Sequence, residues 1–415
     1  MGTDTASREA DIASASRLPS TPVALPASLP QTARVAENGI VAGLHHGAQI
    51  YVSRGASSGP PDFLDLSLGE RAAGQVMTTD TLNLWLSSTK PVTAVAFALL
   101  WQAGEVDLDD AVARYVPEFA QKGKAAVTLR HVLTHTAGIR MLSVGWPEAS
   151  WSEIIATVCR AKPEPRWSLG EKAGYHMASS WFLLGEVISR ISGEPYPSFV
   201  RRRVLEPLGM GDSWIGMPQD RFRAYGDRIG RMWSTEAVAE GQSDSPLARN
   251  WHTERHVVGC SPGGNGYGPI RELGLFYEML LRRGVAQDGQ RLLTPQTVEA
   301  LTTPHRVGLL DQTFRHKLDW GLGFIVDSKH YPAGDDDRNS RDLIPYGYGR
   351  HASRRTFGHS GFQSSTAFAD PKHDLVVCIF TNGNPGEPRH TERFRDLTEA
   401  VYEDLGLGEA GVEAP

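Results

Sequence analysis

The sequence has few cysteines, no long apolar run and no excess of positive charge. Its 415 residues hold three cysteines, Cys159, Cys260 and Cys378, and no two have the spacing of metal ligands or of a redox motif. We expect reduced, mostly buried thiols. The longest apolar stretch, Ala94–Trp101, is too short to span a membrane. A formal net charge of −6 leaves no basic stripe, which excludes nucleic acid and an anionic membrane surface as expected partners.

The N-terminal segment also lacks the features of a targeting signal. It carries charges and prolines where a secretory signal needs an apolar run. Position 6 is Ala6 rather than Ser or Thr, so the myristoylation pattern fails too. The sequence therefore predicts a flexible leader over residues 1–30 and a cytoplasmic location.

Two β-rich regions flank a region of different character. Residues 31–105 and 315–410 contain short runs with the alternation of strands, whereas residues 106–314 combine helical patterns with long Gly- and Pro-rich loops. This order predicts an α/β (α+β) fold, in which an antiparallel sheet flanked by helices carries an inserted, mostly helical domain. The charged segment 328–354 is expected to be a loop exposed to solvent. Its acidic run, Asp335 to Asp337, lacks the spacing of a calcium loop.

The main chemical signal is Ser87-Ser88-Thr89-Lys90, which opens an apolar helical run ending near Gly104. Positions i and i+3 share a helix face, so the Ser87 hydroxyl and the Lys90 amine can be hydrogen-bonded. A serine needs a base to become a nucleophile, and a lysine among apolar walls can have a pKa low enough to serve. A chain of this length should contain about one to two S-x-x-K patterns by chance. The alternative to a catalytic Ser–Lys pair is therefore a chance match, in which an exposed Ser and Lys stand at an ordinary helix start.

The sequence around this tetrapeptide decides between the two interpretations. GEVDLDD follows the helix and VLTHTAG comes next, and the run from Leu84 to Ile139 resembles the serine β-lactamase-like superfamily. That group includes class C β-lactamases, D-aminopeptidases, family VIII-type esterases and transacylases. The resemblance extends through SSWFLLGEVIS, SPGGNGYGP, WGLGF and GHSGF, over about residues 35–405. It implies the β-lactamase/transpeptidase-like fold, with the substrate cleft between the two domains.

The resemblance also implies a tyrosine that exchanges protons with the Ser–Lys pair, within a Tyr-x-Asn element. Tyr175 stands at the matching place, but Met177 replaces the asparagine. In the family this asparagine holds the side-chain amide of the substrate, so its loss argues against β-lactam hydrolysis. The alternative for Tyr175 is a packed loop aromatic, and His176 is expected to support local structure.

A third element of the family lies on a strand that lines the site. Where β-lactamases have Lys-Ser/Thr-Gly, this chain has His359-Ser360-Gly361, a variant found among esterase-like members. His359 is expected to donate to the substrate or to Tyr175, although a capping or core histidine is the alternative. Gly361 lets an acyl group approach the strand. By analogy, the backbone N–H groups of Ser87 and Phe362 form an oxyanion hole.

The segment Gly259-Cys260-Ser261-Pro262-Gly263 matches the G-x-S-x-G pattern of another class of hydrolase. In that class the N–H after the serine holds the oxyanion, and Pro262 has none. Ser261 is therefore not expected to be a nucleophile. Its loop is expected to line the substrate cleft, with Asn265 and Tyr267 as contacts.

Taken together, the sequence predicts a serine hydrolase or acyltransferase that forms an acyl-enzyme on Ser87, with Lys90 and Tyr175 relaying the proton. The expected substrate is a small ester or amide, and no metal or cofactor is implied. A biosynthetic transacylase, which passes the acyl group to an amine or alcohol, remains the alternative. A β-lactamase and a non-catalytic ligand binder are less favoured.

Overall fold

A computed structural model describes residues 25, 27–242, 245, 247–332 and 347–408. Most of the leader predicted over residues 1–30, and the acidic run Asp335 to Asp337, lie outside these residues. The described part of the leader includes Leu29, which is buried, and Pro30, which begins helix α2 (Pro30–Val41). None of the described helices combines the length and the apolar character that crossing a membrane requires.

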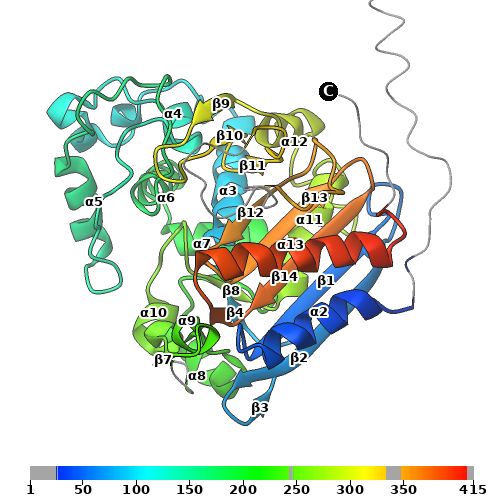
Figure 1. Cartoon of the computed structure of the whole chain (residues 1–415). Coiled ribbons are helices and arrows are strands. Elements are labelled where there is room, and N and C mark those ends of the chain that lie inside the picture. The colour runs from blue at the N-terminus through cyan, green and yellow to red at the C-terminus, as the bar shows by residue number, and fades with distance from the viewer. Residues whose placement is uncertain (1–24, 26, 243–244, 246, 333–346, 409–415) are drawn as a thin grey trace, which may run out of the picture.

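A nine-stranded antiparallel sheet forms the centre of the described structure (Figure 1). Its long central strands pair over their whole length, from Ala48 opposite Thr381 to Arg54 opposite Leu375. Segments from both ends of the sequence thus lie side by side. In sheet order the strands are β3 (Gln75–Val76), β2 (Asp62–Ala72), β1 (Gly47–Arg54), β14 (Leu375–Thr381), β13 (Ser365–Asp370), β12 (Phe357–Gly361), β11 (Ile325–Val326), β10 (Lys317–Trp320) and β9 (Arg306–Leu310).

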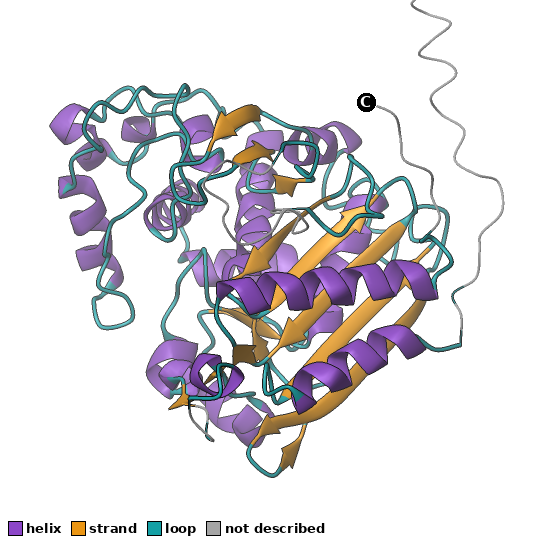
Figure 2. Cartoon of the chain, in the orientation of Figure 1, coloured by secondary structure: helices purple, strands orange, loops and turns teal. Residues whose placement is uncertain are grey.

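Two helices cover one face of the sheet, and Figure 2 shows them crossing in front of it. They are α2 (Pro30–Val41) and α13 (Glu387–Asp404). The Asp404 carboxylate accepts the backbone N–H groups of Gln31 and Thr32, which have no partner within the first turn of α2. Helix α13 therefore fixes the start of α2.

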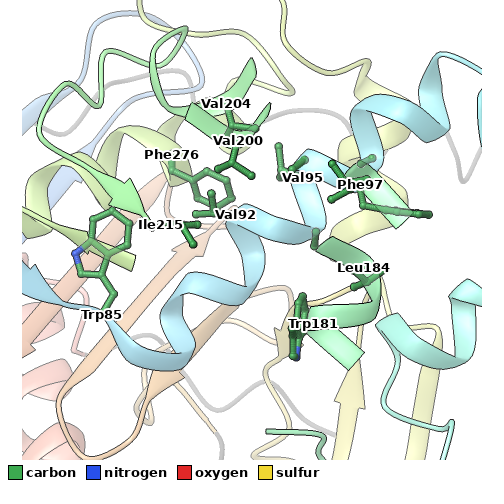
Figure 3. Close-up of a cluster of buried hydrophobic side chains, with 14 of the residues drawn as sticks. Trp85, Val92, Val95, Phe97, Trp181, Leu184, Val200, Val204, Ile215 and Phe276 are labelled. Carbon is green, nitrogen blue, oxygen red and sulfur yellow. The ribbon is translucent and has the colours of Figure 1, made fainter. Parts of the chain in front are cut away.

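The opposite face is packed against α11 (Ile270–Leu281) and α3 (Lys90–Gln102). The α3 helix is apolar nearly all round, as the sequence predicts, and most of it is buried. Figure 3 shows side chains from several elements packed around it. They are Trp85, Trp181, Leu184, Val200, Val204, Ile215 and Phe276, together with Val92, Val95 and Phe97 of α3 itself.

Short helices, 3-10 turns and two small sheets complete the described fold, and most of them lie between α3 and β9 in the sequence. The helices are α4 (Leu129–Leu133), α5 (Trp151–Arg160), α6 (Ser179–Ser192), α7 (Tyr196–Val200) with a π-helical continuation (Arg201–Leu205), α8 (Gln219–Tyr225), α9 (Glu236–Ala239), α10 (Glu254–Val258) and α12 (Pro295–Thr302). The 3-10 turns are Leu86–Thr89, Val112–Arg114, Pro117–Gly123, Gly226–Arg228 and Asn250–His252. The small sheets have the orders β4 (Asn83–Leu84), β8 (Gly266–Gly268), β5 (Trp214–Ile215) and β15 (Gly383–Asn384), β6 (Trp233–Ser234), β7 (Leu247–Ala248).

The expected fold class is confirmed: a large antiparallel sheet is flanked by helices, beside a mostly helical region. The division of the chain into domains at residues 105/106 and 314/315 stays a prediction. Two elements from the expected insertion belong with the sheet, since α11 packs on β1 and β14, and β9 is one of the two edge strands. The three cysteines are free thiols, as expected, and Cys159 and Cys378 are buried.

Candidate active site

Ser87 lies in a tight turn between a short strand and the buried helix. The chain leaves β4 and reaches Leu86, whose φ of 50° is in the left-handed region that a leucine rarely adopts. A 3-10 turn over Leu86–Thr89 then presents Ser87, and α3 begins at Lys90. The Ser87 side chain is half-buried. A non-glycine residue in this conformation costs about 1–2 kcal/mol, which the surrounding contacts must offset.

Those contacts come from β12 and β13. The Ser88 hydroxyl lies 3.1 Å from the His359 carbonyl oxygen and 2.9 Å from Ser365 Oγ, and Ser365 in turn donates to the Trp85 carbonyl at 2.6 Å. A Cβ on Gly361 would lie only 2.3 Å from that same Trp85 oxygen. Only glycine therefore lets the end of β12 approach the turn so closely. Phe362, whose N–H is predicted to share the oxyanion hole with that of Ser87, follows directly.

The Ser87 hydroxyl is shared by two proton-carrying groups. Lys90 Nζ lies 2.9 Å from Ser87 Oγ, and the Tyr175 phenol lies 2.7 Å from the same oxygen. The structure therefore brings the three residues together as the sequence predicts, although Tyr175 lies 88 positions further along the chain. Which atom donates depends on the charge of Lys90.

Lys90 is fully buried, and its described partners are neutral. Besides Ser87, its amine contacts the Gly263 carbonyl oxygen at 2.7 Å, and it lies over the rings of Tyr175 and Trp181 at 4.9 and 5.5 Å. Burial without a counter-charge holds the pKa of Lys90 well below its usual 10.5. A neutral amine donates to Gly263 and accepts the proton of Ser87 through its lone pair. Burial acts oppositely on Tyr175 and raises the pKa of its phenol, so the phenol stays protonated and donates to Ser87.

His359 lies on β12 behind Tyr175, with 6.0 Å between the ring centroids. Its Nδ1 lies 2.8 Å from the Ser360 carbonyl, which can only accept, so Nδ1 carries the proton. Burial is the main cause that lowers the pKa of His359 to about 3. The expectation that His359 donates to substrate or to Tyr175 is corrected: in this neutral tautomer its buried Nε2, which has no partner among the described residues, is an acceptor.

The glycine-rich loop contributes differently from what its sequence suggests. The Asn265 amide donates to the carbonyls of His256 and Gly259, and its oxygen accepts the Ser261 N–H at 2.8 Å. Tyr267 is buried in β8 and donates to the Trp251 carbonyl. The polar groups of both side chains are thus hydrogen-bonded to the protein backbone. Their contact with a substrate stays a prediction.

The part of that loop that reaches Lys90 is the Gly263 carbonyl, which sequence reasoning missed. A Cβ on Gly263 would lie 2.6 Å from the Trp181 ring, so glycine is needed at this approach. Ser261 follows helix α10 rather than a strand. The local structure therefore lacks the strand–turn–helix order of the G-x-S-x-G class.

Two further histidines connect the loops behind Tyr175. The His176 N–H donates to His135 Nδ1 at 2.9 Å, and His176 Nε2 accepts the Ile139 N–H at 3.3 Å. Burial lowers the pKa of His176 to about 3. This geometry gives His176 the structural role expected for it. Met177, in contrast, turns outward and is 52% exposed.

A serine hydroxyl held between a buried amine and a phenol is the arrangement of a serine acyl-transfer enzyme that uses lysine and tyrosine in place of histidine. The comparison with known proteins agrees. A family model described as Beta-lactamase matches residues 31–402, and the chain belongs to this family.

The relatives include an esterase/β-lactamase and penicillin-binding proteins. The chain is 24% identical over 340 residues to "Esterase/beta-lactamase LipL" of Mycobacterium tuberculosis, covering 75% of this chain and 72% of that protein. It is 27% identical over 368 residues to "Penicillin-binding protein 4" of Amycolatopsis lactamdurans, covering 85% and 84%. A solved penicillin-binding protein homologue from Caulobacter crescentus superimposes with a TM-score of 0.69 at 26% identity, over 92% of this chain and 98% of that one. The chain is a serine hydrolase or acyltransferase of this family.

Proposed function

We propose that this enzyme cleaves small, uncharged esters or amides through an acyl-enzyme on Ser87. The observation that carries the proposal is that Ser87 Oγ lies within hydrogen-bonding distance of both Lys90 Nζ and the Tyr175 phenol. Lys90 accepts the Ser87 proton as Oγ bonds to the substrate carbonyl carbon, and the carbonyl electron pair moves onto its oxygen. The N–H groups of Ser87 and Phe362 receive this oxyanion.

Collapse of the intermediate completes the first half of the reaction. The carbonyl re-forms and the bond to the leaving alcohol or amine breaks. The leaving group takes a proton from Tyr175, which is replenished from protonated Lys90. In the second half, Lys90 and Tyr175 remove a proton from water, which attacks the acyl carbon and releases the acid and Ser87. The proton that leaves Ser87 thus departs with the alcohol or amine, and the proton taken from water passes to Ser87 Oγ as the acyl bond breaks, so the cycle balances.

Three features near the site support an uncharged, partly apolar substrate. His359 is neutral and Lys90 has a lowered pKa, so neither offers the lasting positive charge that binds a carboxylate. Two large apolar side chains lie close to site residues in sequence, Met177 two positions after Tyr175 and Phe362 directly after Gly361, and they are 52% and 51% exposed. Exposed apolar groups beside a reactive serine favour contact with an alkyl or aryl group.

Kinetics on a short-chain p-nitrophenyl ester test this function. Ser87→Ala should retain less than about 1% of wild-type kcat/KM with an unchanged circular dichroism spectrum, because it removes the nucleophile. Ser261→Ala is the matched control, since it removes the hydroxyl of the other candidate serine, and should stay within about threefold. Full activity in Ser87→Ala would overturn the proposal.

Transfer to an alcohol or amine remains the second candidate, and one observation favours it. The Nε2 of His359, which has no hydrogen-bond partner among the residues that the structure describes, is a buried acceptor near Tyr175, suited to orienting the O–H or N–H of an incoming nucleophile. Product analysis with and without added alcohol distinguishes the two. A dedicated transacylase gives mainly the new ester at millimolar acceptor, whereas a hydrolase gives mainly free acid.

A further inference from the structure

Tyr175 is held through its backbone by a segment that follows β9. Its N–H donates to Asp311 Oδ1 at 3.1 Å, and its carbonyl accepts the Thr313 hydroxyl at 3.1 Å. One step earlier, the Gln312 N–H donates to the Ala173 carbonyl at 2.9 Å. Phe314 packs on the Tyr175 ring with 4.7 Å between centroids. Residues 311–314 thus contact the backbone of Tyr175 on both sides and one face of its ring.

Asp311 makes most of the hydrogen bonds that hold this segment, and it is fully buried. Besides Tyr175, its Oδ1 accepts the N–H groups of Thr313 and Phe314 at 2.9 and 3.1 Å. Its Oδ2 pairs with Arg306 Nη2 at 3.0 Å, and both side chains are at most 1% exposed. Burying an ion pair is costly unless every lone pair and proton is used. Here the carboxylate is satisfied by three N–H groups and one guanidinium.

Arg306 is itself anchored, so the pair cannot shift alone. Its Nη1 donates to the Thr134 carbonyl at 3.1 Å, and its guanidinium lies 4.9 Å over the Trp320 ring. Trp320 in turn meets His135 and His359 edge-on. The ion pair therefore joins β9, the loop before His135 and the aromatic wall of the site into one rigid support.

We propose that Asp311, held by Arg306, is a positioning residue that fixes the backbone of Tyr175 and thereby the distance from its phenol to Ser87. This inference rests on the proposed function, because the distance between the phenol and Ser87 matters for the rate only if the two groups exchange a proton. The phenol oxygen is about 7 Å from the tyrosine backbone, so a rotation of about 10° moves it by roughly 1 Å, beyond hydrogen-bonding reach. A misplacement of that size can cost about 100-fold in rate.

Asp311 does not act as a base in this arrangement. Both of its oxygens are already occupied, by backbone N–H groups and by Arg306, and its contact with the site is through the N–H of Tyr175. Its negative charge also contributes to the raised pKa of Tyr175. This charge effect gives a readout that a general loss of stability would not produce.

A double-mutant cycle between Asp311→Asn and Tyr175→Phe tests the proposal. Asparagine keeps the oxygen that accepts the Tyr175 N–H but removes the charge that binds Arg306. Asp311→Asn should lower kcat on a p-nitrophenyl ester by about 10- to 100-fold, with KM within about threefold. In the Tyr175→Phe background, where no phenol remains to position, the same change should cost less than about threefold. Equal losses in both backgrounds would show a merely structural role and overturn the proposal.

Asp319→Asn is the matched control. Asp319 is another buried acid, on the neighbouring strand, and accepts the Gly308 N–H at 2.9 Å and the Tyr331 hydroxyl at 2.8 Å. It should leave kcat within about threefold in both backgrounds. Removing the Asp311 charge lowers the pKa of Tyr175, so the alkaline limb of the kcat profile should move to lower pH in Asp311→Asn and stay in place in Asp319→Asn.

A second variant keeps the test decisive if Asp311→Asn fails to fold. Thr313→Val removes the hydroxyl that donates to the Tyr175 carbonyl and accepts from Arg140 Nη1 at 3.3 Å, and should lower kcat about three- to tenfold; Thr313→Ser should restore it. The valine loss should vanish in Tyr175→Phe, and a loss that persists there contradicts the proposal. Failure of the proposed function looks different, because Ser87→Ala and Tyr175→Phe would then both keep wild-type activity.

Discussion

At the scale of single residues, burial lowers the pKa of two bases at the site, Lys90 and His359. Their hydrogen-bond partners, however, differ. Lys90 has a neutral amine beside Ser87, whereas the one ring N–H of His359 donates to the Ser360 carbonyl. Only Lys90 can therefore take the Ser87 proton directly. The S-x-x-K spacing predicted this contact, because i and i+3 meet on one face. The His359 tautomer could not be predicted, since it depends on a carbonyl whose orientation only the fold defines.

The pH dependence of ester hydrolysis should reflect Lys90 and not His359. Deprotonation of Lys90 creates the base, so kcat/KM should rise with pH through a limb well below pH 10.5. His359, with a pKa of about 3, is already neutral and should add no inflection near pH 6.5. The profile of His359→Gln should keep the shape of the wild type. An acid limb near pH 6.5 that disappears in His359→Gln would make the histidine the base.

Lys90 should also reduce the stability of the folded state. Lys90→Met replaces a buried amine by an apolar chain of similar length, so we expect an unchanged or higher free energy of unfolding, by up to about 2 kcal/mol. Because the folded state lowers the pKa of Lys90, the penalty is fully present at low pH and disappears as pH approaches 10.5. Urea titrations at two pH values measure it. A loss of more than about 2 kcal/mol would contradict this view of Lys90.

At the scale of secondary structure elements, the site is built where β12 meets the turn before α3. The strands β1, β2, β12, β13 and β14 and the helices α6, α11 and α13 follow the local patterns of the sequence closely. By contrast, β9 and the contact between Asp311 and Tyr175 had no local signal, because the two residues are 136 positions apart. Contacts of that separation are defined by tertiary packing, which periodicity does not reveal.

The approach of β12 to the nucleophile turn makes Gly361 a sensitive position. In Gly361→Ala the new methyl group would lie 2.3 Å from the Trp85 carbonyl oxygen, so β12 or the turn must move. We expect kcat/KM to fall at least about tenfold and the free energy of unfolding to drop by about 1–3 kcal/mol. Gly59→Ala, where no atom of the described residues lies within 4 Å of the new methyl group, is the control and should be neutral. Wild-type kinetics in Gly361→Ala would show that the close approach is not needed.

At the scale of the whole molecule, a serine β-lactamase-like fold carries a site altered at two anchoring positions. The family resemblance, already visible in the sequence, predicted the fold and the three central residues. The substrate could not be predicted in this way. Met177 and His359 depart from the family's Tyr-x-Asn and Lys-Ser/Thr-Gly elements at the two positions that would bind a β-lactam. The exposed Met177 and the neutral His359 provide no amide and no cation there.

Penicillins and cephalosporins should therefore be poor substrates beside simple esters. The two missing groups would each contribute a charge-assisted or polar contact of about 1.5–3 kcal/mol. Together they correspond to roughly two to four powers of ten in kcat/KM. Steady-state kinetics with nitrocefin and with a series of p-nitrophenyl esters measure the difference. A nitrocefin kcat/KM equal to that of the best ester would mean that other residues replace both anchors.

Labelling with a fluorophosphonate is the measurement that shows whether Ser87 forms the covalent intermediate. The probe bonds to an activated serine, and peptide mapping by mass spectrometry identifies that serine. We predict one label per chain on the peptide containing Ser87, lost in Ser87→Ala and retained in Ser261→Ala. A label on Ser261, or no label on an enzyme that hydrolyses esters, would contradict the account.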